Sequence, residues 1–308
     1  MVRYWLIYVV VFAVFAFGED KHPRLPKRNA RIVTKDVIDF CQLNITNSCG
    51  REGQCMSKRS GNRCKCPEGW MGHGCRRPCQ DIYKSCTQWV EHKRCEWAKP
   101  ISPFFADNCP LSCGQCQSNG FSLPIPLPPI LEHVSFMIGR WKTTTATGQR
   151  YPRNMDGPYT EVLDISITEV PAFDRPPLNF SCRAQSLSSK LVNTELGFIT
   201  IKPFLEDTGF VEFDKPSHGP DKIGLEMASN TGIITIEEGV IKKDVVVLEM
   251  THQKDYFNKF AVDVSMRIFK VDPSKRFLTE VSTVTFKDGR QQVWKKVFTK
   301  EFDYLNDF

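Results

Sequence analysis

Between residues 131 and 305, apolar and polar side chains alternate with the two-residue period of a β-strand. In the segment 261–268, the two valines, the methionine and the isoleucine face one way, while Asp263, Ser265 and Arg267 face the other. Similar segments are Val162–Val170, Leu178–Leu187, Glu195–Pro203, Gly224–Met227, Gly232–Glu237, Asp244–Thr251, Phe277–Phe286 and Gln292–Phe302. Breaks rich in Gly, Asn and Pro separate them. The pattern predicts an all-β antiparallel meander closed into a barrel.

The first residues have the layout of a secretory signal. A basic start at Arg3 is followed by an apolar run, Tyr4–Phe17, and a small residue at Gly18. This run is shorter than the roughly 20 residues that cross a bilayer. We therefore expect residues 1–18 to be a cleaved signal peptide, with the anchor of a type II single-pass plasma-membrane protein as the alternative. Either way, the rest of the chain is expected to be extracellular.

The net charge of +6 is concentrated in one stretch of a short basic tether, residues 19–36. Six basic residues and no acid lie between Lys21 and Lys35, so the remainder of the chain is nearly neutral. A solvated linker is the simplest interpretation, and contact with acidic glycans or a membrane surface is the alternative. No nucleic-acid partner is expected, because the positive charge lies on a tail and not on a folded face.

Twelve of the thirteen cysteines lie between Cys41 and Cys116, in two consecutive groups of six. The first group, within residues 37–76, ends in a loop with the pattern C-x2-G-W-x-G-x2-C and resembles an EGF-like domain. So small a module cannot bury a sufficient core, and disulfides must stabilise it. Six cysteines permit fifteen pairings; the resemblance implies Cys41–Cys55, Cys49–Cys64 and Cys66–Cys75. Because Asp39 is the one acidic group where calcium-binding relatives place several ligands, no calcium site is expected.

The second group, residues 79–116, has Asp81 shortly after its first cysteine and ends in C-x3-C-x2-C, which resembles a ShKT domain. The resemblance implies the pairs Cys79–Cys116, Cys86–Cys109 and Cys95–Cys113. Zinc is the alternative for a C-x2-C pair, but no second pair stands at ribbon spacing, so we expect no metal. Channel-blocking relatives carry a lysine where Pro103 stands here, which favours a structural or adhesive role. The adjacent Phe104 and Phe105 form a candidate contact patch.

After a proline-rich linker, residues 117–130, the barrel region 131–305 resembles the nitrobindin family of THAP4-like haem-binding barrels. The resemblance depends on Ile138–Trp141, Tyr151-Pro152, Glu195–Phe198, Asn230–Ile233 and Glu238-Gly239. It implies a ten-stranded barrel with a pocket at one end, in which a histidine of the last strand ligates ferric haem.

In this chain Trp294 stands where that haem ligand is expected. An indole N–H is a donor with no lone pair for iron. We therefore expect no haem and no other cofactor, and a pocket that is filled by Trp294 or kept for another apolar ligand. The remaining candidate ligands, His133, His218 and His252, are expected at the surface or in loops.

Asn44-Ile45-Thr46 and Asn179-Phe180-Ser181 are N-glycosylation sequons. A glycan on Asn179 requires an outward side chain, which places Cys182, three residues along the same strand, on the inward face. The odd cysteine, Cys182, is then a buried free thiol, and an intermolecular disulfide is the alternative.

No catalytic motif is recognisable in the sequence. We therefore predict a non-enzymatic extracellular or cell-surface binding or adhesion protein with a protein or matrix partner. The order of its modules resembles that of nematode type II membrane proteins that shape the male tail and body surface, which implies a role in epidermal or cuticle morphogenesis. The alternative function is an extracellular carrier or sensor of haem, nitric oxide or another small apolar ligand.

Overall fold

A computed structural model describes residues 41–45, 48–58, 61–98, 100, 104–169, 176–202, 222–242, 244–255 and 262–307. The expected signal segment and the basic tether lie outside the described residues. Within the described ranges, no helix has the length and apolar character needed to cross a membrane.

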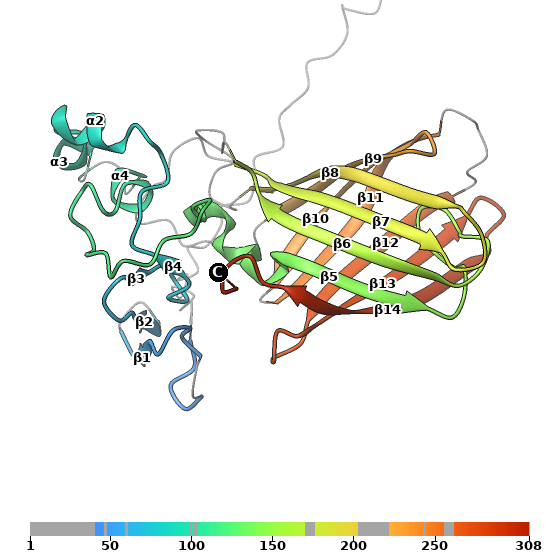
Figure 1. Ribbon diagram of the computed structural model, residues 1–308, viewed down its shortest axis with the longest axis horizontal. Coiled ribbons are helices and arrows are strands. Elements are labelled where there is room, and N and C mark those ends of the chain that lie inside the picture. Colours follow the sequence, from blue (N-terminus) through green and yellow to red (C-terminus); the bar gives the residue numbers. More distant parts are fainter. Residues whose placement is uncertain are drawn as a thin grey trace, which may run out of the picture. The chain divides into compact units, whose positions relative to one another are not determined.

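The C-terminal domain is a closed barrel of antiparallel strands in the order β10-β11-β12-β13-β14-β5-β6-β7-β8-β9 (Figure 1). The strands are β5 (Gly139–Thr145), β6 (Tyr159–Ile167), β7 (Leu178–Ser186), β8 (Val192–Lys202), β9 (Lys222–Ser229), β10 (Ile233–Lys242), β11 (Val245–Asp255), β12 (Val262–Val271), β13 (Phe277–Phe286) and β14 (Gln291–Phe302). Consecutive strands pair with each other, and β14 closes the barrel by pairing with β5. The predicted fold class, cysteine-rich modules followed by an antiparallel barrel, is confirmed.

Nine of these strands overlap the segments that the alternation predicts. The alternation does not single out β5. In β12 the pairing with β13 shifts between Val262 and Val264. Val262 is buried, whereas Val264 and Met266 are exposed and Arg267 is buried. Directly after this shift Val264 and Met266 therefore face solvent while Ser265 and Arg267 face the barrel interior, in line with the buried Phe269 and Val271 further along.

One end of the barrel is filled by an apolar core. It includes Trp141, Phe180, Phe269 and Phe298. The 3-10 helix η1 (Pro129–Met137) packs into this core, and the Trp141 indole donates a 2.8 Å hydrogen bond to the Met137 carbonyl. Two leucines of the preceding proline-rich segment also join the core, namely Leu123 and Leu127. The expected linker therefore contributes to the barrel as well as connecting to it.

The two cysteine modules contain little regular structure. The first has the short strands β1 (Gln54–Met56), β2 (Arg63–Lys65), β3 (Trp70–Met71) and β4 (Arg77–Pro78). The second has the helices α2 (Cys86–Glu91), α3 (Arg94–Ala98) and α4 (Phe104–Asn108). Six disulfides join Cys41–Cys55, Cys49–Cys64, Cys66–Cys75, Cys79–Cys116, Cys86–Cys109 and Cys95–Cys113. These are the pairs that the family resemblances imply, and they indicate an extracellular location because disulfides persist in oxidising compartments.

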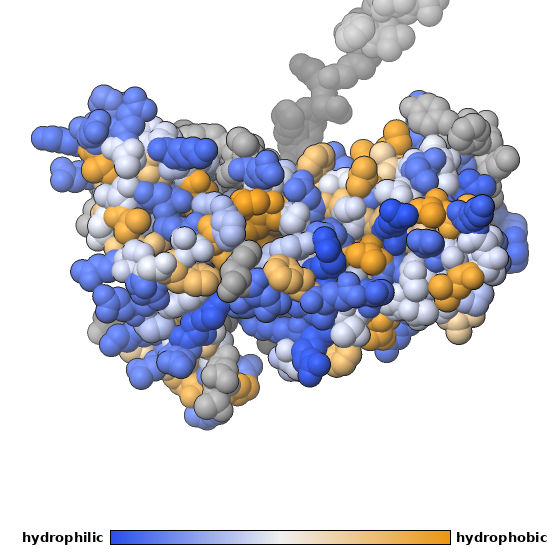
Figure 2. All heavy atoms as spheres, viewed as in Figure 1, coloured by the Kyte–Doolittle hydropathy of each residue, from blue (hydrophilic) through white to orange (hydrophobic). Residues whose placement is uncertain are grey.

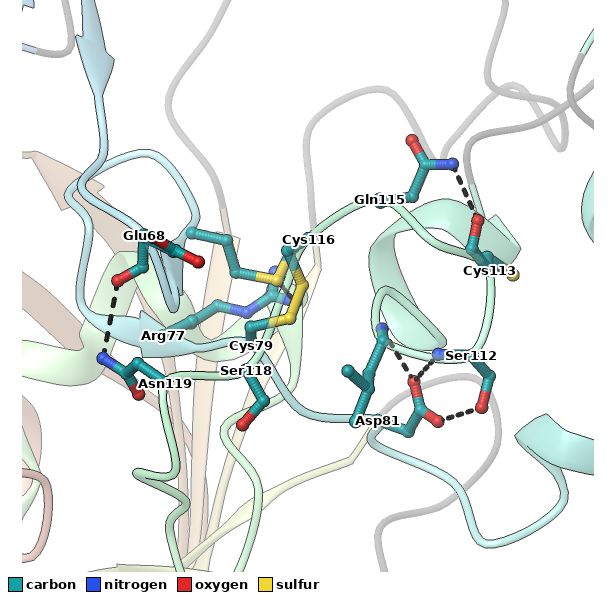
Figure 3. Close-up of a disulfide and its surroundings, with 12 residues drawn as sticks. Glu68, Arg77, Cys79, Asp81, Ser112, Cys113, Gln115, Cys116, Ser118 and Asn119 are labelled. Carbon is teal, nitrogen blue, oxygen red and sulfur yellow. Dashed lines mark hydrogen bonds between the residues drawn. A yellow bond between two sulfur atoms is a disulfide. The ribbon is translucent and has the colours of Figure 1, made fainter.

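Asp81 stabilises the last turn of the second module, close to the Cys79–Cys116 bridge (Figure 3). One carboxylate oxygen accepts hydrogen bonds from the Leu111 and Ser112 backbone N–H groups, each at 3.0 Å, and the other accepts from the Ser112 hydroxyl. Two otherwise free amides of a tight turn are thereby satisfied by one side chain.

The candidate contact patch, Phe104 and Phe105, is only partly exposed. Both rings pack against Trp89, and Phe105 does so edge-on at 5.3 Å between ring centroids. Trp97 on α3 is instead 62% exposed, next to Arg94. The contact function of the two phenylalanines stays a prediction, and Trp97 is the aromatic residue most open to solvent in this module.

Candidate ligand-binding site

The loop between β5 and β6 folds into the open end of the barrel. Its residues Arg150 and Tyr151 are almost fully buried, and the Tyr151–Pro152 peptide bond is cis. The Arg150 guanidinium donates a hydrogen bond from Nη1 to Glu195 Oε1 at 2.6 Å, and its Nε lies 3.4 Å from Glu161 Oε1. A loop side chain thus connects β6 to β8 from inside the barrel.

Beneath this loop, charged side chains from several strands meet in the barrel interior. Lys296 Nζ lies 3.1 Å from a Glu161 carboxylate oxygen and 2.8 Å from one of Glu280. Arg267 pairs with Glu237 at 2.5 Å. We call this group the charged layer; every member is at most 5% exposed, and it comprises Arg150, Glu161, Glu195, Glu237, Arg267, Glu280 and Lys296. Acids and bases nearly balance, as buried charges must, because an unpaired buried charge is strongly destabilising.

The neighbours of each carboxyl group decide its ionisation. Burial favours the neutral acid, yet Lys296 and Arg150 lower the pKa of Glu161 to about 2. Burial also opposes the charged form of Lys296, but Glu161 and Glu280 raise its pKa above the usual value. This pair is therefore ionised at neutral pH. At Glu237, by contrast, burial outweighs Arg267 and raises the pKa of the carboxyl group.

Cys182 is part of the apolar core and also contacts two members of the charged layer. Its thiol donates a 2.8 Å hydrogen bond to Glu161 Oε1 and accepts one from Arg150 Nη2 at 3.4 Å. Burial raises the pKa of the thiol well above its usual value. Cys182 is free and buried, and its raised pKa disfavours the thiolate, which is the reactive form of a cysteine.

A cavity of about 370 Å³ lies at the mouth of the barrel. The segment Arg150–Asn154 forms one wall, and residues of β12, β13 and β14 form the other. Apolar side chains such as Val284 and Phe286 line the strand side. The exposed Arg153 and Arg290 supply guanidinium groups at its edge. The cavity is of the size that small-molecule sites have.

Trp294 points into this cavity from β14 and packs with Tyr151, Val262 and Val284. Its indole Nε1 is buried and has no hydrogen-bond partner in the part of the chain that the structure describes. A buried donor without a partner costs about 1–3 kcal/mol. Trp294 lines the cavity without filling it.

The histidines considered from the sequence do not line the mouth cavity, although His252 lines a second pocket that shares Val262 with it. His133 is exposed on η1, His252 is exposed on β11, and His218 lies outside the described residues. The sulfurs of Cys41, Cys49 and Cys64 approach one another within 4.8 Å. Each of them is already in a disulfide, so none offers a thiolate to a metal.

Sequence reasoning missed the charged layer entirely. Its members are single Glu, Lys and Arg residues, and in an alternating strand such residues are normally assigned to the face that contacts solvent. The one available signal was the position of Glu161 and Lys296 between large apolar or aromatic residues at i ± 2. Arg150 gave no signal, because it lies in a loop.

Comparison with known families supports both recognisable regions. Residues 130–300 match the family model described as "THAP4-like, heme-binding beta-barrel domain", which is more than half of the chain. Residues 78–116 match the model described as "ShK domain-like". The predicted resemblances of the barrel and of the second cysteine module are therefore confirmed.

Individual relatives are distant. An uncharacterized Caenorhabditis elegans protein is 25% identical over 169 residues, which cover 52% of each chain. Proteins named peroxynitrite isomerase THAP4 are 29% identical in Homo sapiens and 30% in Mus musculus, over 38% of this chain and 17% of theirs. A crystal structure of Rv2717c from M. tuberculosis is 18% identical, with a TM-score of 0.41, and covers 57% of this chain and 99% of that one. The chain spans about half the length of the nematode relative and far less of THAP4.

Two predictions from the sequence are wrong in the light of these relatives. The expectation of no cofactor is overturned by the description of the matching family as heme-binding. The expectation of a non-enzymatic protein is overturned by relatives whose name is that of an isomerase. The absence of a sequence motif failed as an argument because catalytic residues can be assembled from separate strands.

The described residues at the mouth do not supply a histidine-ligated haem. No imidazole or thiol lines the cavity among them, and Trp294 offers only an N–H. Tyr151 is the remaining candidate, but its hydroxyl donates to Met250 Sδ at 3.4 Å. Burial and the nearby Glu237 also raise its pKa, which opposes the phenolate form. The cavity nevertheless combines apolar walls with two arginines, which suits a flat apolar molecule that carries carboxylates.

Proposed function

Because the chain belongs to the family of THAP4-like, heme-binding β-barrel domains, we propose that its barrel binds a small ligand in the mouth cavity beside Trp294. The observation that carries this proposal is the cavity of about 370 Å³ itself, which Trp294 lines together with apolar side chains and two arginines. Ligand sites of this kind are mostly apolar, with a few polar groups that orient the ligand.

The proposed ligand is flat and apolar and carries acidic groups. Val284, Phe286 and Trp294 supply the apolar contacts. Arg153 and Arg290 at the edge can pair with carboxylates, which guanidinium groups bind in a bidentate way. Haem has this combination of features, and it is the first ligand to test. Its iron would not receive an axial nitrogen from position 294.

The test is a haem titration of the purified chain, followed by its absorption spectrum and by tryptophan fluorescence. We expect saturable quenching and a broad Soret band in the native protein. Trp294→His should give a sharper, shifted Soret band, because it introduces an iron ligand facing the cavity. Trp97→Ala is the matched control: it removes an exposed indole of the second cysteine module and should leave binding unchanged. If neither the native protein nor Trp294→His binds haem, the proposed site is refuted.

A second candidate function is peroxynitrite isomerisation, for which the THAP4 relatives are named. Its support is the sequence match of 119 residues with those proteins. The assay is the yield of nitrate from peroxynitrite, with and without added haem. A nitrate yield equal to that of buffer plus free haem would exclude this activity.

The cysteine modules are proposed to face an extracellular protein or matrix partner. Support comes from the six disulfides and from Trp97, which is 62% exposed. The EGF-like resemblance of the first module and the nematode-type module order favour a role at the body surface. Contact of the basic tether with acidic glycans or a membrane belongs to the same proposal. Localisation of a tagged full chain tests it: retention inside cells, without surface or matrix signal, would contradict it.

A further inference from the structure

We propose that Asn179 is N-glycosylated and that the first sugar of this glycan packs on the exposed ring of Phe198. The proposal concerns the outer wall of the barrel and is independent of any ligand in the mouth cavity. It requires passage of the chain through a secretory compartment, which the six disulfides support.

The strand geometry turns both ends of the sequon outward. Along β7 the side chains of Leu178, Phe180 and Cys182 are buried, whereas those of Asn179 and Ser181 are partly exposed. The acceptor amide and the hydroxyl that completes the Asn-x-Ser signal thus lie on the same outer face, as residues two apart in a strand do. The residue between them is not proline, so the signal is complete.

An apolar platform lies directly beside this signal. On the neighbouring strand β8, Phe198 is paired in register with Asn179, and Leu196 with Ser181. Phe198 is 49% exposed and Leu196 is 58% exposed. Residues directly opposite each other in an antiparallel pair have Cβ atoms about 4.5–5.5 Å apart. A sugar attached to the Asn179 amide therefore begins within reach of the phenylalanine ring.

The exposed pair on β8 needs an explanation in a secreted protein. Figure 2 shows hydrophilic side chains over most of the visible face, with separate hydrophobic patches on the barrel. Large apolar residues that are adjacent on an outer wall are contact surfaces or aggregation hazards. The C–H face of a sugar can cover an aromatic ring while its hydroxyl groups remain in water. A glycan on Asn179 would thus remove the hazard from this part of the wall.

The side-chain amide of Asn179, which would accept the glycan, is also not engaged elsewhere in the described structure. Within the described ranges, no hydrogen bond uses the Asn179 side-chain amide. The second sequon is less informative: Asn44 is exposed, but Thr46 lies outside the described residues. No apolar residue is paired with Asn44 in a sheet, since it lies in a turn. Only Asn179 therefore has a described surface against which a sugar can be placed.

The reaction is a group transfer without oxidation or reduction. The co-reactant is a lipid-linked oligosaccharide diphosphate of the secretory pathway. A bond forms between the Asn179 amide nitrogen and the anomeric carbon of the first sugar, while the bond from that carbon to the diphosphate oxygen breaks. The lipid diphosphate leaves with the electron pair, and the amide loses one proton to a base of the transferring enzyme.

Occupancy is tested on the full chain expressed in an animal cell line with its own N-terminal segment. Peptides are mapped before and after an amidase that removes N-glycans and converts each modified asparagine to aspartate. We expect this conversion at Asn179 in the majority of chains, and its loss in Ser181→Ala but not in Asn44→Gln. Unmodified Asn179 in both the secreted and the cell-retained protein would overturn the proposal.

The packing claim is tested by a double-mutant comparison of melting temperatures. Phe198→Ala should lower Tm by about 2–4 °C more in the glycosylated protein than in the Asn179→Gln background, which is the shift expected for a contact of about 1 kcal/mol. Val293→Ala is the matched control, because Val293 is an exposed outward residue of β14, separated from β7 by β5 and β6. Its effect should be the same in both backgrounds. Equal losses for Phe198→Ala in both would refute the sugar contact.

Discussion

Arg150 and Glu195 meet at 2.6 Å inside the barrel, although 45 residues separate them in the sequence. Arg150 comes from the loop over the mouth and Glu195 from the wall strand β8. Because both side chains are almost completely buried, neither can exchange its partner for water. The contact therefore fixes the loop that forms one wall of the mouth cavity.

Replacement of this arginine should be strongly destabilising. Arg150→Met removes the buried cation and leaves Glu161 and Glu195 with less compensation, which costs about 3–5 kcal/mol for a buried pair. Urea unfolding of the purified variant measures the loss. Arg153→Met, an exposed residue of the same loop, should change the free energy of unfolding by no more than about 0.5 kcal/mol. Similar effects of the two substitutions would contradict the inserted position of Arg150.

Two adjacent lysines of β14 should differ sharply. Lys296 is buried between Glu161 and Glu280, whereas Lys295 is exposed on the outer face. Lys296→Met should lower the free energy of unfolding by about 3–5 kcal/mol, and Lys295→Met by no more than about 0.5 kcal/mol. In a double-mutant cycle with Glu280→Gln, the two losses should be less than additive. Additive losses would mean that the lysine and Glu280 do not interact.

The charged layer also predicts acid sensitivity. The pKa of Glu161 is about 2 in the folded protein and about 4.5 in the unfolded chain, where the carboxyl group is solvated. The folded value is the lower one, so the ionised carboxylate contributes stability above pH 4.5, and this contribution is lost as the pH falls from about 5 towards 2. The loss from this group is on the order of 3 kcal/mol. Unfolding curves across that interval measure it, and Lys296→Met should show a shallower decline. An unchanged decline in the variant would contradict the assignment to this pair.

Thiol titration should distinguish the thirteen cysteines. Twelve are in disulfides, and Cys182 is free and buried. We expect no reactive thiol in the native protein, one after unfolding without reductant, and all thirteen after unfolding with reductant. Cys182→Ala serves as the control, since it should show none in the second condition. More than one thiol in the unreduced, unfolded protein would mean that a disulfide of the cysteine modules is not formed.

Local pattern predicted much of this fold. Period-two alternation located nine strands of the barrel, and cysteine spacing located both disulfide modules, because both signals depend on residues close together in the sequence. Alternation did not locate the strand β5; the family resemblance implied a tenth strand without assigning its residues. The correspondence of Trp294 to the haem-ligand position stays a prediction, although the structure places its side chain among the residues that line the mouth cavity.

What the sequence determined by itself is which residues share a face of each strand and which region requires cross-links. Only the tertiary structure decided that Ser265 and Arg267 point into the barrel while Val264 and Met266 point out. Alternation alone does not show which face of a strand is inside, and the shift in the pairing of β12 exchanges the inward and outward faces at this point. The charged layer depends on closure as well: Arg150 and Lys296 are stable in the interior only because separate strands bring carboxylates within about 3 Å of them, the separation at which paired charges offset the cost of leaving water.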